Sequence, residues 1–167
     1  MPPVIAAIVF SLLTVSRDSV QVPTPIPSPD TAQAIAFLEF VKNGESAEAR
    51  ARGFDVAEGG HWDNPRFIRF LDPGGVTFFD TNGDTTWHLS PARIRAQLAR
   101  RSGTGYAMVV HLGHIYGQRE PQYSKLTFAA DSEGVRVTVG SWYRLTFVRR
   151  GQRLRLAKIE YVMKEDT

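Results

Sequence analysis

The segment from His61 to Pro65 has residue types that can do chemistry, since it reads His-Trp-Asp-Asn-Pro. An indole ring beside a carboxylate excludes water, and desolvation raises the pKa of a carboxyl group towards the range of a general base. Asp63 is therefore a candidate catalytic base. We favour a simpler interpretation, in which Asp63 and Asn64 cap a short helix that begins at Pro65 and His61 lies on the surface.

Catalysis by a carboxylate base also needs a second polar group, which stabilises the negative charge that develops on the substrate. If the protein is an enzyme, we assign catalysis to Asp63, His114 and Tyr143. His111 and His114 stand three positions apart in a predicted strand, so they would point to opposite faces unless a bulge intervenes. The histidine and tyrosine side chains available for the second role are Tyr106, His111, His114, Tyr116 and Tyr143.

Two patterns are reminiscent of metal sites, and neither meets the requirements of one. Asp80–Asp84 has the opening spacing of a calcium loop, but Thr85 stands where that loop needs glycine and Pro91 where it needs a bidentate glutamate. A hairpin turn at Asn82-Gly83 explains the same residues, because Asn-Gly adopts the positive φ angles of a type I′ turn. The histidines include no pair at the His-x-x-x-His spacing of a helical zinc site. We therefore predict no metal and no cofactor.

Basic side chains are concentrated in the last predicted hairpin, which turns at Gly151-Gln152. Together with nearby aromatic rings they could form an anion or nucleic-acid surface. Charged hairpin tips are, however, ordinary solubilising features that prevent edge pairing, and the net charge of the chain is only +3. We therefore predict no nucleic-acid partner. The residues are Arg144, Arg149, Arg150, Arg153, Arg155 and Lys158.

The bulk composition is that of a soluble globular protein of 167 residues, and this length suits a single domain with a real core. The chain contains no cysteine. Disulfides, thiolate metal sites and a cysteine nucleophile are therefore excluded.

The first part of the chain predicts export. Residues 1–21 contain an apolar run, Val4–Val15, which is typical of a signal peptide and too short to span a bilayer. No basic residue precedes the run, so a retained hydrophobic leader is the alternative. Residues 22–29 have proline at every second position, which predicts a stiff extended spacer. One domain then covers residues 30–167. We expect a secreted or periplasmic protein without a stable membrane span, with the cytoplasm as the alternative location.

Capping residues and apolar spacing predict the helices. The two most clearly marked helices open with a serine N-cap followed by proline, at Ser28-Pro29 and Ser90-Pro91. Asn43-Gly44 is expected to end the first of them. The predicted helices cover residues 29–43, 45–52, 65–71 and 91–102.

Alternation of apolar and polar residues predicts the strands. Val76–Thr81 and Asp84–Leu89 flank the Asn-Gly turn, and four longer runs follow at Tyr106–Gly117, Tyr123–Asp131, Val135–Arg149 and Arg153–Lys164. The residues assigned to the core face of the third run are Val135, Val137, Val139, Tyr143, Leu145 and Phe147. Those assigned to its opposite face are Arg136, Thr138, Trp142, Arg144 and Thr146.

The order of two helices, a hairpin, a helix and four long strands resembles the nuclear-transport-factor-2-like superfamily over about residues 30–164. The resemblance rests on the opening helix pair, the junction Thr86–Ile94, and a closing hairpin whose last strand contains Ile-Glu-Tyr-Val. It implies an α+β fold of mixed topology, with a curved, mainly antiparallel sheet wrapped into a cone around the N-terminal helices. Some catalytic relatives place an acidic residue just before a proline at the mouth of the cone, which is the position of Asp63.

The superfamily includes isomerases, dehydratases, polyketide cyclases and binding modules, so the fold alone leaves the function open. We expect non-catalytic binding of a small apolar ligand or a protein partner, because no matched acid–base pair can be read from the sequence. The alternative is a cofactor-independent isomerase, dehydratase or cyclase with Asp63 as its base. The predicted interface is Trp142, Arg144 and Tyr161, since aromatic and arginine side chains on a sheet face favour binding. Relatives dimerise through this face, so the resemblance implies a homodimer.

Overall fold

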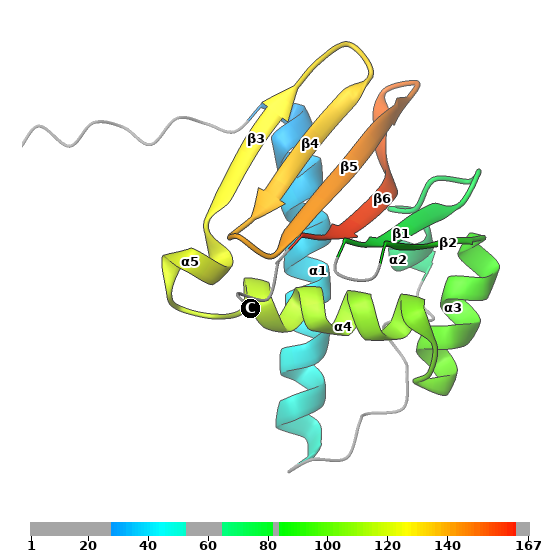
Figure 1. Cartoon of the computed structure of the whole chain (residues 1–167), viewed down its shortest axis with the longest axis vertical. Coiled ribbons are helices and arrows are strands. Elements are labelled where there is room, and N and C mark those ends of the chain that lie inside the picture. The colour runs from blue at the N-terminus through cyan, green and yellow to red at the C-terminus, as the bar shows by residue number, and fades with distance from the viewer. Residues whose placement is uncertain (1–27, 53–64, 82–83, 163–167) are drawn as a thin grey trace, which may run out of the picture.

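One mixed sheet packed against helices forms the part of the chain that the computed structural model describes, which is residues 28–52, 65–81 and 84–162 (Figure 1). Its strands are β1 (Val76–Asp80), β2 (Thr85–Leu89), β3 (Leu126–Ala130), β4 (Gly134–Val139), β5 (Tyr143–Arg150) and β6 (Arg153–Tyr161). Their spatial order is β2-β1-β6-β5-β4-β3. Neighbouring strands are antiparallel except β1 and β6, which pair parallel.

The predicted α+β class is confirmed, and so are the β1–β2 hairpin strands and the mixed topology. Wrapping of the sheet into a cone stays a prediction. The predicted leader over residues 1–21, the spacer as far as residue 27 and the Asn82-Gly83 turn lie outside the described residues.

A single long helix, α1 (Pro29–Arg52), replaces the two that the sequence predicted, so the expected break at Asn43-Gly44 is wrong. A glycine inside a helix costs only about 1 kcal/mol relative to alanine, which tertiary packing readily offsets. The predicted start is confirmed, because the Oγ atom of Ser28 accepts a hydrogen bond from the backbone N–H of Thr31 at 3.2 Å.

The second marked helix, α3 (Pro91–Arg100), also begins as predicted. The Oγ atom of Ser90 accepts a hydrogen bond from the backbone N–H of Arg93 at 3.3 Å, and Ile94 and Leu98 are fully buried. The short helix α2 (Pro65–Ile68) ends earlier than the predicted Pro65–Leu71. Leu71 instead forms an isolated parallel bridge with Leu156 of β6.

The predicted strand Tyr106–Gly117 is wrong, because this segment lies in the helix α4 (Thr104–Tyr116). Alternation and helical periodicity are hard to separate in a segment that is apolar almost throughout. The helix lies across α1 and contacts it (Figure 1), so tertiary packing selects the helical form. A one-turn helix, α5 (Pro121–Ser124), follows before β3. The buried side chains of α4 recur at helical spacing, at Met108, Val109, Leu112 and Ile115.

The predicted run Val135–Arg149 is two strands, β4 and β5, joined by a turn after Val139. Gly140 in this turn has a φ of 56°, a backbone conformation that favours glycine. The predicted alternation is nevertheless confirmed, since all six residues assigned to the core face are buried. On the other face Arg136 and Arg144 are exposed.

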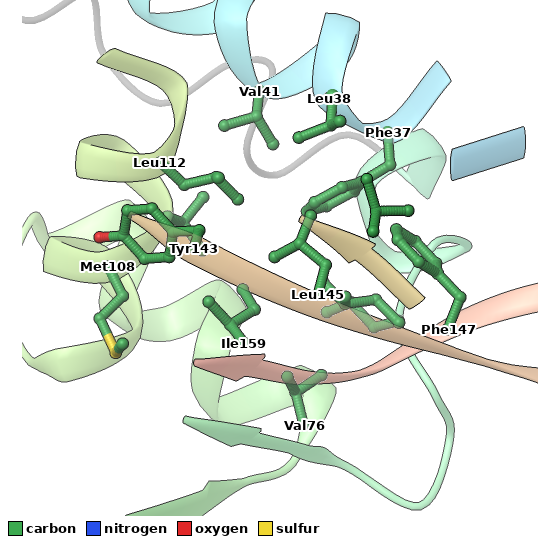
Figure 2. Close-up of a cluster of buried hydrophobic side chains, with 14 of the residues drawn as sticks. Phe37, Leu38, Val41, Val76, Met108, Leu112, Tyr143, Leu145, Phe147 and Ile159 are labelled. Carbon is green, nitrogen blue, oxygen red and sulfur yellow. The ribbon is translucent and has the colours of Figure 1, made fainter. Parts of the chain in front are cut away.

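The core lies between the sheet and the helices α1 and α4 (Figure 2). Phe37 and Leu38 of α1 are fully buried, as are Leu145 and Phe147 of β5. The rings of Phe37 and Phe147 meet edge to face with their centroids 5.8 Å apart. Full burial of one such side chain contributes about 1.5–3 kcal/mol, so this packing fixes α1 over the sheet.

Two bidentate ion pairs hold the end of β5 against other elements. The guanidinium group of Arg149 binds Asp30 in the first turn of α1, and that of Arg150 binds Asp72, which follows the Leu71 bridge. The shortest N–O distance is 2.7 Å in each pair. The last two residues of β5, which precede the turn at Gly151-Gln152, are thereby tied to segments far away in the sequence.

Candidate functional site

The neighbouring strands β1, β6 and β5 place three polar side chains next to one another on the sheet. Asp80 of β1 pairs in register with Tyr161 of β6, and Tyr161 pairs with Tyr143 of β5. Side chains of residues paired in this way point to the same face of a sheet. The row forms because β1 runs parallel to β6, which brings the ends of both strands to the edge where β5 begins.

Helix α4 lies over this row and leaves a pocket of about 390 Å³. Its lining from α4 consists of Thr104, Ala107, Met108 and His111, whose spacing of three and four puts them on one side of the helix. Trp87 of β2 completes the wall. Pockets for small molecules usually have volumes of about 300–1,000 Å³. This one has mainly apolar and aromatic walls that carry a few polar groups.

A hydrogen bond inside the pocket joins α4 to β5, because the Nδ1 atom of His111 lies 2.8 Å from the hydroxyl oxygen of Tyr143. The tyrosine ring extends from β5 towards α4, near Met108 and Leu112 (Figure 2). Tyr143 is only 1% exposed. This bond is a polar contact that joins α4 to the sheet in the wall of the pocket.

The surroundings keep both partners of this bond neutral. Burial raises the pKa of the Tyr143 hydroxyl, and the neighbouring Tyr161 and Asp80 raise it further. Burial lowers the pKa of the His111 imidazole, and the charge of His114 lowers it further. An imidazole whose pKa lies below its usual value is neutral near pH 7, so His111 can accept a proton there.

Aromatic rings surround His111 and restrict its rotation. The centroid of its imidazole lies 5.9 Å from that of Trp142, 5.7 Å from that of Tyr143 and 5.8 Å from that of Tyr161. Rings that meet edge to face or tilted at such distances attract one another. A second pocket, of about 480 Å³, also has His111 in its wall, together with His114 and Trp142. His111 therefore contributes to both hollows.

Of the predicted catalytic residues, Tyr143 lines the first pocket. Asp63 lies outside the described residues. His114 is exposed, and its Nε2 atom lies 2.9 Å from the Nε2 atom of Gln118 in the wall of the second pocket. The expectation that His111 and His114 point to opposite faces of a strand is wrong, because the two residues lie about one turn apart on the helix α4.

Sequence reasoning kept His111 as one candidate among several without assigning it to the site, and it missed Asp80. Had residues 104–116 been assigned to a helix, the spacing of Thr104, Met108 and His111 would have placed the histidine on the same side as two other lining residues. Asp80 had been considered only as part of a calcium loop. Its place beside Tyr161 depends on the parallel pairing of β1 with β6, which no local pattern indicates.

The three predicted interface residues do not share a face. Trp142 lies in the turn before β5 and is half-buried, with its ring centroid 5.7 Å from that of Tyr123 and 6.1 Å from that of Tyr161. Tyr161 lines the first pocket. Arg144 follows Tyr143 in β5, so it points to the opposite side, where it is exposed. The homodimer through the sheet face stays a prediction.

The residues that the structure describes contain no group of three or more histidine, aspartate or glutamate side chains placed to hold a metal ion. Among the described helices, none combines the length and the apolar character needed to cross a bilayer.

No protein-family model matches the chain, and comparisons with curated proteins and with solved structures found no significant match.

Proposed function

We propose that the pocket between α4 and the sheet binds a small, mostly apolar ligand that carries one hydroxyl or carbonyl group. The observation that carries the proposal is the hydrogen bond between His111 and Tyr143 in the wall of a largely apolar pocket. A polar pair within apolar walls fixes the orientation of a ligand, while the walls supply most of the affinity. Met108 supports adaptable packing, because its side chain is flexible and polarisable.

The polar pair suits both kinds of ligand group. When the O–H of Tyr143 donates to Nδ1 of His111, the phenolic oxygen can still accept a hydrogen bond from a ligand hydroxyl. In the other tautomer Nδ1–H donates to Tyr143, which leaves the tyrosine O–H to donate to a ligand carbonyl. The carboxyl group of Asp80 in the same wall disfavours an anionic ligand.

Blocking the pocket provides a test. The probe is 2-naphthol, an apolar bicycle with one hydroxyl group, titrated into the full chain and followed by chemical-shift changes of the protein. Ala107 is exposed on α4 and lines the pocket, so Ala107→Trp should fill the space without disturbing the core. The matched control is Ala99→Trp on the exposed side of α3. We expect binding in the wild type and the control, and its loss in Ala107→Trp. Equal binding by all three proteins would refute the proposal.

A second candidate, proton transfer at carbon next to a carbonyl, is favoured by one observation. In the tautomer with the proton on Nδ1, His111 keeps Nε2 as a proton acceptor while Tyr143 can donate to the oxygen on which negative charge develops. This is the chemistry of a cofactor-independent isomerase, dehydratase or cyclase. It would use His111 as the proton acceptor and Tyr143 as the hydrogen-bond donor, in place of Asp63, which lies outside the described residues.

Exchange of α-protons tests this candidate without knowledge of the natural substrate. The protein is incubated with 2-tetralone in D₂O, and loss of the α-proton signals is followed by NMR. We expect exchange above the buffer rate in the wild type and none above it in His111→Gln or Ala107→Trp. A wild type that never exceeds the buffer rate would end the catalytic version and leave the binding proposal standing.

We also propose a relationship to the nuclear-transport-factor-2-like superfamily. It is supported by the order in the described chain of a long helix, a hairpin, helices and four antiparallel C-terminal strands. The additional helix α4 in place of a predicted strand departs from the order on which the resemblance was first based. A solved structure with a closed cone-shaped sheet would support the relationship, and a flat sheet would contradict it.

A further inference from the structure

A third hollow, of about 330 Å³, lies where β6 begins, beside the first turns of α1. Its lining includes the half-buried Phe70 and the buried core residues Phe147 and Leu154. Three arginines, Arg69, Arg153 and Arg155, also line it. It shares no lining residue with the pocket around His111 and Tyr143. The hollow therefore combines apolar surface with concentrated positive charge.

Backbone pairing brings these arginines together. The N–H of Leu156 donates to the carbonyl oxygen of Phe70 at 2.6 Å, and the N–H of Asp72 donates to the carbonyl oxygen of Leu156 at 2.8 Å. The segment after α2 thus runs alongside β6 and places Arg69 near the start of that strand. The Oε1 atom of Gln33 accepts the N–H of Leu154 at 3.0 Å, which closes the hollow on the α1 side.

Five arginines near the turn between β5 and β6 fall into two groups. Arg149 and Arg150, at the end of β5, are neutralised by Asp30 and Asp72. In contrast, Arg69, Arg153 and Arg155 have no ion pair with a carboxylate in the described part of the chain. Arg155 nevertheless lies close enough to Asp72 for its charge to lower the pKa of that carboxyl group. Three like charges around one hollow repel one another, and a bound anion would relieve that repulsion.

Two further features suit a ligand rather than an open charged surface. The guanidinium group of Arg69 lies over the ring of Phe70, 5.3 Å from its centroid, and this contact limits the positions that the charge can take. Arginine also binds carboxylate and phosphate groups through two parallel hydrogen bonds. The half-buried ring of Phe70 beside these charges can hold an uncharged ring of the ligand.

We propose that this hollow, which we term the arginine pocket, binds a soluble small molecule that carries a carboxylate or phosphate group on an apolar ring. The ring packs on the half-buried side chain of Phe70, and the oxyanion lies between Arg69, Arg153 and Arg155. The volume of the hollow favours a small molecule, and the modest net charge of +3 disfavours a nucleic acid. The proposal does not depend on the function of the His111 pocket.

The test uses phenyl phosphate, inorganic phosphate and benzyl alcohol at constant ionic strength, with chemical-shift titrations of the full chain. Judged by the shifts of residues that line the arginine pocket, we expect phenyl phosphate to bind there at least about tenfold more tightly than either of the other two, because only it makes both kinds of contact. Arg69→Gln and Arg153→Gln should each weaken its binding at least about fivefold, the loss of one charge-assisted hydrogen bond. Ala36→Glu, which adds a negative charge to the exposed wall, should weaken it as well.

The controls separate this site from general charge effects. Arg144 is exposed on β5 and does not line the arginine pocket, so Arg144→Gln should bind phenyl phosphate like the wild type. Tyr143→Phe should also bind normally, because its hydroxyl belongs to the other pocket. The proposal is overturned if phenyl phosphate does not saturate the protein, or if Arg144→Gln weakens binding as much as Arg153→Gln. It is also overturned if vesicles of phosphatidylglycerol bind the protein while phenyl phosphate does not.

Discussion

The hydroxyl oxygen of Tyr143 lies 2.8 Å from the Nδ1 atom of His111, so a single hydrogen bond connects the first residue of β5 with the middle of α4. The two residues are 32 positions apart in the sequence. The bond crosses the boundary between the sheet and the helical layer at the wall of the pocket. It therefore serves both the fold and the proposed binding of a ligand.

Removal of the phenolic hydroxyl separates these two roles. Tyr143→Phe keeps the ring in the core and should lower the free energy of unfolding by only about 1 kcal/mol, the usual net contribution of one buried hydrogen bond. Tyr143→Ala should cost about 3–5 kcal/mol, because it leaves a cavity where the ring packed. Urea denaturation of both variants measures the difference. Equal losses would show that the ring packs less tightly than the structure indicates.

Acidification should destabilise the protein through His111. Because the pKa of His111 is lowered on folding, its contribution to stability is fully present above the ordinary value of 6.5 and is lost as the pH falls towards the folded value. The free energy of unfolding of the wild type should therefore fall more steeply than that of His111→Gln from about pH 7.5 to about pH 5. Parallel curves from urea denaturation would contradict this assignment.

Acidic side chains lose their contribution in a lower pH range. The pKa values of Asp30 and Asp72 are lowered from 3.8, mainly by hydrogen bonds from Arg149 and Arg150. Their contribution is present above 3.8 and is lost as the pH falls below it. The range from about pH 7.5 to about pH 5 therefore reports on the histidine rather than on these carboxylates.

The two carboxylates should differ in their effect on stability. The side chain of Asp72 is 8% exposed and also accepts the N–H of Gly74 at 3.2 Å, whereas that of Asp30 is 24% exposed. Arg150 is 56% exposed, so solvent screens its pair with Asp72. Asp72→Asn should therefore cost about 1 kcal/mol, and Asp30→Asn should cost less. Chemical denaturation at neutral pH tests the ranking, which a larger effect of Asp30→Asn would reverse.

Two glycines with positive φ provide a matched test of the closing turns. Gly151 has a φ of 62° and no atom near the position of a Cβ, so Gly151→Ala should cost about 1–2 kcal/mol from backbone strain alone. Gly140 has a φ of 56°, and a Cβ there would collide with the carbonyl oxygens of Gln122 and Tyr123. Gly140→Ala should therefore be clearly more destabilising in a thermal melt. Equal melting temperatures for the two variants would contradict the close approach of the turn to α5.

Capping side chains and the alternation of apolar and polar residues correctly predicted those elements that depend on neighbouring residues. Ser28 and Ser90 start helices as their capping side chains indicated, and the alternation in β4 and β5 gave the correct core face. The prediction for residues 106–117 was wrong, because contact with α1 decides between helix and strand in a segment of nearly uniform apolar character.

The candidate site was less accessible to sequence reasoning than the fold. Tyr143 was selected as a polar group of the interior, and it does line a pocket. The sequence predicts His111 only as one of several candidates for the second polar group and assigns catalysis to His114, whereas the structure places His111 beside Tyr143. Asp80 lies beside Tyr161 and Tyr143 because strands that are distant in the sequence pair with one another. Residue types do not reveal which distant strands pair.

The central claim is that the pair of His111 and Tyr143 recognises a polar group on an apolar ligand. The most direct measurement compares the binding of 2-naphthol and naphthalene to the wild type and to Tyr143→Phe by chemical-shift titration. We predict that the wild type prefers 2-naphthol by about 5- to 10-fold, the effect of one hydrogen bond, and that Tyr143→Phe binds the two compounds equally. A preference for 2-naphthol that persists unchanged in Tyr143→Phe would contradict the claim.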